Sequence, residues 1–192
     1  MNPESRATYP RRKAVAAGIA ATVATVLGVR GVDARLVLMR GVTGGGLAKI
    51  DNVAEPGLAN LSIFASAMQL PEGETVFVGQ VNWIEAGTGL TLESTQISEC
   101  VPFGDNPGAR RVSGRMTVNG AGDYPFVIRT LDDGAPGAGR DTIELEVNGA
   151  TVGDQIPIET TIGEGTYAAS ARLVAGDFQL LSYDMGTADT GA

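Results

Sequence analysis

The sequence contains no histidine, and this absence excludes more chemistry than any other feature of its composition. Without an imidazole, neither a Ser/His/Asp nor a Cys/His catalytic arrangement can form, and no histidine can ligate zinc. A Ser–Lys pair would have to use Lys49, the only lysine after residue 13, and no S-x-x-K spacing surrounds it. No stretch fits a phosphate-binding loop or a dinucleotide fingerprint. The composition therefore predicts a protein that is not an enzyme.

Cysteine and aromatic residues are also scarce. Cys100 is the only cysteine, so no intrachain disulfide can form. Its thiol is either buried and inert, the reading that we favour, or the partner in an intermolecular disulfide. Aromatic residues make up 5% of the chain, which holds 27 glycines, a composition that suits a fold with many tight turns.

Basic residues are few once the N-terminal region is set aside. Residues 1–34 carry five of the 14 bases and two of the 22 acids, so nine bases and 20 acids remain, a net charge of −11. A surface of this sign repels phosphate backbones and anionic lipids, which predicts no nucleic-acid partner and no membrane contact beyond the N-terminal region. The acidic excess serves solubility, which we favour, or cation binding.

The N-terminal region has the pattern of a secretory signal. Residues 11–13 are basic, residues 14–29 hold no charge, and Val32 and Ala34 are small or β-branched residues where a signal peptidase reads. The 16-residue apolar run is shorter than the roughly 20 residues of a spanning helix. We expect residues 1–34 to be a signal helix and the protein to be secreted or on the cell surface. The export route and uncleaved anchoring stay open.

The rest of the chain divides into three parts. We expect a flexible or strand-like linker over residues 35–46, an all-β domain over residues 47–181 and a disordered tail over residues 182–192. The glycines at 44–46 are typical of a flexible joint. Residues 36–39 are either the domain's own first strand or a strand donated to a neighbour.

Alternating apolar and polar residues predict about eight or nine short antiparallel strands. The strongest is residues 75–85, where Phe77, Val81 and Trp83 share one face, and a turn joins it to residues 90–97 in a hairpin. This face is either core, which we favour, or a stacking platform for sugars. Short strands at such spacing are typical of a β-sandwich or a barrel-like domain.

Several turn-bounded segments resemble those of the post-COAP domain of secreted bacterial proteins. They are residues 79–84 (GQVNWI), 87–92 (GTGLTL), 115–120 (RMTVNG), 124–126 (YPF) and 132–142 (DDGAPGAGRDT). The resemblance spans about residues 45–181. It implies an exported domain that is often appended to larger surface proteins and has no established activity. The chain differs from the family in its insertion at residues 150–165 and in having Glu85 and Ala86 where members often carry histidine.

An acidic loop is the one candidate ligand site. Asp132, Asp133 and Asp141 lie within ten residues, and the glycines between them let carbonyl oxygens converge. Ca²⁺ takes six to eight such oxygens, which makes these three residues the predicted metal ligands. The alternative, which we favour, is an ordinary structural turn in which Arg140 pairs with one of the acids.

These observations predict a non-catalytic secreted or cell-surface β-module with a structural or adhesive role, which associates with itself or with other surface proteins through an edge strand. The first alternative is an accessory domain that binds calcium or carbohydrate. The second is a hydrolase that uses two carboxylates. Apart from Ca²⁺, no cofactor is expected.

Overall fold

The computed structural model describes residues 38–52, 57–134, 139–149 and 166–184. These residues form eight antiparallel strands, each hydrogen-bonded to the next, and the last strand also pairs with the first, so that the sheet closes into a barrel. In chain order the strands are β1 (Leu38–Ile50), β2 (Gly57–Gln69), β3 (Thr75–Glu85), β4 (Thr91–Pro102), β5 (Ala109–Val118), β6 (Ala121–Leu131), β7 (Thr142–Asn148) and β8 (Thr166–Asp184). The predicted all-β antiparallel fold is confirmed, and of its two forms the barrel is the one observed.

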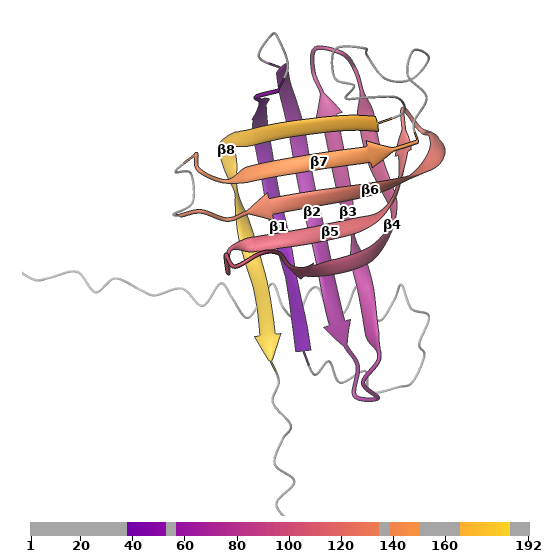
Figure 1. Cartoon of the computed structure of the whole chain (residues 1–192), viewed down its shortest axis with the longest axis vertical. Helices are drawn as coiled ribbons and strands as arrows, with labels where there is room; N and C mark the ends of the chain where they lie inside the picture. The colour runs from indigo at the N-terminus through magenta and orange to yellow at the C-terminus, as the bar shows by residue number, and fades with distance from the viewer. Residues whose placement is uncertain (1–37, 53–56, 135–138, 150–165, 185–192) are drawn as a thin grey trace, which may run out of the picture.

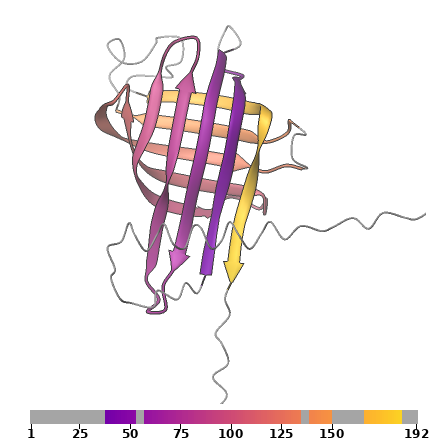
Figure 2. The ribbon, with the colours of Figure 1, turned by 180° about the vertical axis from the view of Figure 1, so that it is seen from behind.

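Two sets of strands cross in the barrel wall (Figure 1). β1, β2 and β3 run along the long axis, and β5, β6 and β7 cross them on the opposite wall, as the reverse view also shows (Figure 2). β8 belongs to both sets, because residues 166–172 pair with β7 and residues 171–184 pair with β1. This long strand bends to join the two walls.

The register of β8 against β1 shifts between Leu47 and Ala48, next to a position where two glycines face each other. Gly176 of β8 is the register partner of Gly46 of β1, and their φ angles are 108° and 148°. A Cβ atom on Gly176 would lie 2.0 Å from the carbonyl oxygen of Gly45, and one on Gly46 would lie 2.0 Å from that of Ala175. The expectation of a flexible joint at residues 44–46 is therefore wrong. The glycines stand within a strand because two backbones approach closely there.

β1 is a strand of its own barrel. Leu38 and Met39 pair with β2 on one side and with β8 on the other, so these two residues are not donated to a neighbour. β1 crosses the border expected between residues 46 and 47, and β8 continues to Asp184 rather than ending at residue 181. The predicted signal helix lies outside the described residues. Among those that are described, no helix is long and apolar enough to span a membrane.

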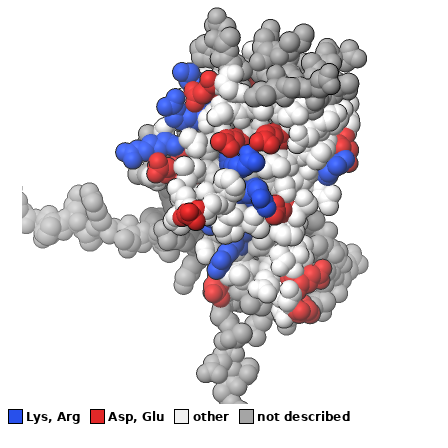
Figure 3. Space-filling model, viewed as in Figure 1, with Lys and Arg blue, Asp and Glu red and all other residues white. Residues whose placement is uncertain are grey.

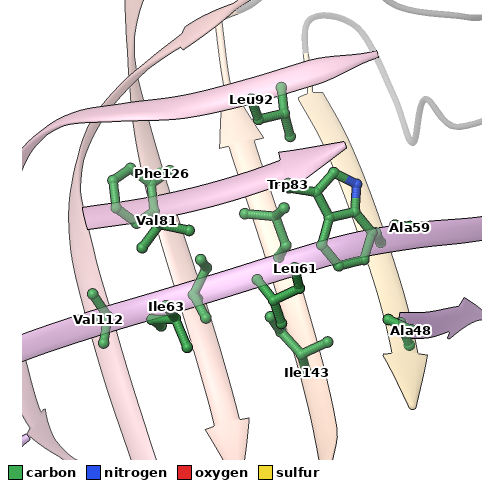
Figure 4. Close-up of a cluster of buried hydrophobic side chains, with 14 of the residues drawn as sticks. Ala48, Ala59, Leu61, Ile63, Val81, Trp83, Leu92, Val112, Phe126 and Ile143 are labelled. Carbon is green, nitrogen blue, oxygen red and sulfur yellow. The ribbon is translucent and has the colours of Figure 1, made fainter. Parts of the chain in front are cut away.

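Side chains fill the barrel interior, as is usual for a barrel of eight strands. The largest of the fully buried side chains are Trp83, Tyr167, Phe126 and Phe178. Figure 4 shows Trp83 and Phe126 within the cluster of buried apolar side chains. The prediction that Val81 and Trp83 belong to the core is confirmed, while Phe77 packs against its margin and is half-buried. Trp83 is 0% exposed and therefore offers no stacking surface to a sugar.

Candidate functional site

Part of the barrel wall projects beyond the crossing strands (Figures 1 and 2). β4 pairs with β3 only at Asn82, Trp83 and Ile84, and then turns away to pair with β5. Residues 75–81 of β3 therefore pair with β2 alone, and residues 173–184 of β8 pair with β1 alone. We call the four paired segments the projecting sheet; they are residues 177–184, 38–45, 62–69 and 75–82. β8 forms one of its edges and β3 forms the other.

Two carboxylates from the loop between β6 and β7 cover the β8 edge. The Oδ2 atom of Asp141 accepts a hydrogen bond from the backbone amide of Phe178 at 2.7 Å, and Asp132 accepts one from the backbone amide of Leu180. Because Phe178 and Leu180 are alternate residues, their amides point to the same side of β8. The carboxylates therefore occupy the donors that a further strand would need.

The rest of this loop is built around the same edge. Asp141 is 6% exposed, and its Oδ1 atom accepts a hydrogen bond from the amide of Asp133 at 3.1 Å, while its carbonyl accepts one from the amide of Leu173 at 2.9 Å. Burial raises the pKa of Asp132, and the negative charges of Asp141 and Asp177 raise it further. Backbone N–H groups that donate hydrogen bonds to Asp132 and Asp141 therefore hold these two acids close together.

The predicted cation ligands Asp132, Asp133 and Asp141 do lie together, but their contacts differ. Asp132 and Asp141 accept backbone hydrogen bonds, whereas Asp133 contributes its amide and leaves its side chain exposed. Within the described ranges, no group of three or more His, Cys, Asp or Glu side chains is arranged to hold a metal ion. Residues 135–138 of the loop lie outside those ranges. The Ca²⁺ site stays a prediction, and the backbone contacts supply a reason for these acids that needs no ion.

Among the residues that the structure describes, the β3 edge has no comparable cover. The amide of Val81 points toward β4 and donates a hydrogen bond to the Oγ atom of Ser94 at 2.8 Å. Backbone groups of alternate residues point to the same side of a strand, so those of Gly79, Phe77 and Thr75 also face this side. There β4 has already left the sheet, and no other strand of the described residues pairs with this side of residues 75–80.

The residues of the β3 edge lack the usual protection against strand pairing. Natural sheets protect open edges with charged side chains, prolines or bulges. Residues 75–80 (TVFVGQ) contain no charge and no proline, and their pairing with β2 continues without a register shift. A short, uncharged run of β-branched and aromatic residues favours pairing with another strand. The sequence had marked this run as a strong strand but held no sign that its outer side is open.

A shallow pocket lies on the crossing wall. It encloses about 290 Å³ between the turn after β4 and strands β6 and β7. Phe103 at its rim is 38% exposed, and the Arg129 guanidinium lies 5.5 Å from the centre of its ring. Arg129 also pairs with Glu146 at 2.8 Å and with Glu144 at 3.4 Å. Basic and acidic side chains lie side by side over this face (Figure 3), and the sequence analysis had singled out none of them.

A buried carboxylate lies at the end of β3 remote from the projecting sheet. Glu85, 3% exposed, accepts hydrogen bonds from the Tyr167 hydroxyl, from Trp83 Nε1 at 3.4 Å and from Thr88 Oγ1 at 2.8 Å. Burial raises the pKa of Tyr167, and the negative charge of Glu85 adds to the effect. The contact joins residues 82 positions apart, so the sequence offers no local sign of it. This enclosed network ties β3 to β8.

Cys100 is buried in the barrel, as we favoured from the sequence. It is 3% exposed, and its Sγ atom lies 3.5 Å from the carbonyl oxygen of Ala65. Burial raises the pKa of the thiol to about 11, because the thiolate would lose its hydration. A thiol of this kind is neutral and unreactive at physiological pH.

In the described part of the chain, the fold and these contacts define the class of the protein as an antiparallel β-barrel of eight strands with a projecting sheet, whose β8 edge is covered by carboxylates and whose β3 edge pairs with no other described strand. Comparison with known proteins finds no family model, no curated protein and no solved structure that matches the chain. The resemblance to the post-COAP domain therefore stays a prediction.

Proposed function

We propose that the chain is a non-catalytic secreted or cell-surface β-module with a structural or adhesive role, which associates with itself through an edge strand. The apolar filling of the barrel supports a scaffold rather than a ligand carrier. The hydrogen bonds of the buried acids Glu85 and Asp141 to protein groups support a structural use of these carboxylates.

The observation that carries this proposal is the difference between the two edges of the projecting sheet. The donors of Phe178 and Leu180 on the β8 edge are bound by carboxylates, while β4 leaves the β3 edge after three paired positions. Soluble proteins that stay monomeric protect the edges of their sheets, because an open edge pairs with other chains. A strand added to the β3 edge would form hydrogen bonds with its outward N–H and C=O groups. Such pairing would explain why this edge is open.

The non-catalytic part of the proposal follows from the acids that surround the pocket. A hydrolase with two carboxylates needs an acid and a base facing each other across a substrate cleft. The pocket is lined by Asp105 and Glu144, but Glu144 pairs with Arg129 and is held as an ion pair. The pocket therefore does not present two unpaired carboxylates facing each other across a cleft.

Residues 1–34 support export, because a basic segment is followed by an apolar run and then by small residues. We expect the mature protein outside the cytoplasm with its first residue near position 35. Mass spectrometry of protein recovered from cell fractions checks this. Full-length chain found in the cytoplasm alone would remove the exported role and leave the edge argument untouched.

Sedimentation equilibrium of residues 35–192 tests the self-association. The average mass should rise above that of the monomer as protein concentration increases, and Phe77→Lys should weaken this rise because it places a charge on the open edge. Ile84→Lys is the matched control: it adds the same charge on β3, at an exposed position that pairs with β4. A monomer at every concentration would contradict the proposal.

A second candidate function, carbohydrate binding, is supported by the pocket beside Phe103. A ring 38% exposed, next to Arg129 and Glu144, offers both a stacking face and polar partners for hydroxyl groups. Titration with a panel of monosaccharides and oligosaccharides checks this, with Phe103→Ala to abolish binding and Leu58→Ala, another exposed apolar residue, as the control. If none of the sugars in the panel binds, carbohydrate binding is ruled out as a candidate function.

A further inference from the structure

We infer that the β3 edge pairs with the β3 edge of a second copy of the chain, antiparallel and about a two-fold axis at Phe77. The inference rests on the proposed self-association and names its surface, its partner and its register. It begins from the backbone groups of Thr75, Phe77 and Gly79, which face the side that β4 has left.

The spacing of these groups fits a two-fold axis. In an antiparallel pair, residues of the hydrogen-bonded type exchange two N–H···O bonds, and they recur at every second position. With the axis at Phe77, this residue lies opposite its own copy, and Thr75 lies opposite Gly79 of the second copy. The outward N–H and C=O groups of each copy then form hydrogen bonds with those of the other copy. The same patch serves both partners, as a closed dimer requires.

The side chains of the edge agree with this register. Val76 of one copy lies opposite Val78 of the other, and pairs of β-branched residues across strands are stabilising. Within the two paired strands no like charges lie opposite each other, because Glu74, the acid directly before β3, lies opposite Gln80, whose Nε2 atom donates a hydrogen bond to Glu93 of its own chain at 3.4 Å. For a chain with a net charge of −8, a stretch without charged residues from Thr75 to Gln80 favours a contact between copies.

The other edge is a poorer partner for β3. Pairing of β3 with β8 of a second copy would displace Asp141 and Asp132 from the amides of Phe178 and Leu180. It would also join the copies head to tail, a contact that continues into open chains rather than closing. The Ser94 hydroxyl, bound to the amide of Val81, ends the open stretch after Gly79.

Cysteine trapping tests the register directly. In a Cys100→Ala background, Phe77→Cys places two thiols on the axis, where hydrogen-bonded residues have Cα atoms about 5.5 Å apart, within the range of a disulfide. Thr75→Cys is the matched control, because it lies opposite Gly79 and roughly 13 Å along the strand from its own copy. Mild oxidation should convert most of the Phe77→Cys protein to a disulfide dimer and leave Thr75→Cys monomeric.

A positive or a negative charge introduced at the exposed residue Gln80 gives a second test, which does not depend on the packing of Phe77. Gln80→Lys should strengthen the dimer through Glu74 of the second copy, and Gln80→Glu should weaken it. Each change affects two exposed pairs, so the dissociation constant should shift roughly two- to tenfold in opposite directions. Sedimentation equilibrium measures this constant apart from the stability of the monomer.

The outcomes separate the inference from the function on which it rests. A dimer in which Phe77→Cys does not form the disulfide, or in which both Gln80 variants shift the constant in the same direction, overturns the register while self-association stands. A chain that remains monomeric throughout overturns both. Cross-linking of Phe77→Cys without cross-linking of Thr75→Cys supports both.

Discussion

Glu85 and Tyr167 show how single polar side chains are used inside this barrel. The carboxylate is 3% exposed and is held by a tyrosine hydroxyl, an indole and a threonine hydroxyl. A buried polar group is costly only when it lacks partners, and here every partner belongs to the protein. The network therefore stabilises the end of the barrel and fixes how β8 meets β3.

Tyr167→Phe tests the stabilising role of this network. Removing the hydroxyl leaves Glu85 with one hydrogen bond fewer in a buried site, and hydrogen bonds to charged groups contribute about 1.5–3 kcal/mol. We expect the free energy of unfolding to fall by that amount in urea titrations. A loss below about 0.5 kcal/mol would mean that the hydroxyl contributes no more than an exposed group.

Cys100 gives the barrel a pH dependence in the alkaline range. The thiol has an ordinary pKa of 9.0 and a pKa of about 11 in the folded chain, so the neutral form is favoured by folding. Its contribution to stability is complete below pH 9 and is lost as pH rises from 9 to about 11. The slope is at most about 1.4 kcal/mol per pH unit.

Cys100→Ala isolates this contribution from other groups that titrate at high pH. Unfolding free energies of both proteins, measured from pH 7 to 11, should show the wild type losing stability more steeply than the variant above pH 9. Parallel curves over that range would show that burial does not hold the thiol neutral.

At the scale of the element, the loop between β6 and β7 acts as a cover for the β8 edge. Asp132 and Asp141 stand where the carbonyl groups of another strand would stand. Charged residues at an edge also repel incoming strands, so the same two acids satisfy the backbone and discourage pairing. The position of the acids, rather than their number, gives the loop its role.

Asp141→Ala and Asp133→Ala separate this role from a cation site. Asp141→Ala uncovers the amides of Phe178 and Asp133 and should lower the free energy of unfolding by about 2–4 kcal/mol, while Asp133→Ala, whose side chain is exposed, should change it little. Thermal melts should be the same with and without millimolar Ca²⁺. A rise in the melting temperature with Ca²⁺ that Asp133→Ala abolishes would instead establish the predicted metal site.

The sequence predicts the strands of this barrel better than it predicts their partners. Alternation is a local property, so it marks the run that contains Val81 and Trp83 as a core strand. The partners of a strand depend on residues far along the chain. Gly46 therefore reads as part of a flexible joint until it is seen opposite Gly176, and no local pattern indicates that the amide of Phe178 donates a hydrogen bond to Asp141. The open side of β3 follows from where β4 turns away, which no local pattern records.

At the scale of the whole molecule, the described residues combine a closed barrel with an open stretch of β3 where β4 turns away. β8 passes from one wall to the other and closes the sheet, so most backbone groups find partners within the chain. Among the described residues, β3 and β4 part after three paired positions, so that the stretch of β3 from Thr75 to Gln80 pairs with β2 alone and β4 beyond Glu93 pairs with β5 alone. We expect two barrels to join along this stretch into a closed dimer with a continuous sheet.

Amide hydrogen exchange of residues 35–192 at low and high protein concentration tests this claim most directly. The amides of Thr75, Phe77 and Gly79 should exchange rapidly in dilute solution and become protected as the concentration rises, because a second β3 edge then accepts their hydrogen bonds. The amides of Phe178 and Leu180, already bound to carboxylates, should be protected at both concentrations. Rapid exchange of Thr75, Phe77 and Gly79 at every concentration would contradict the account.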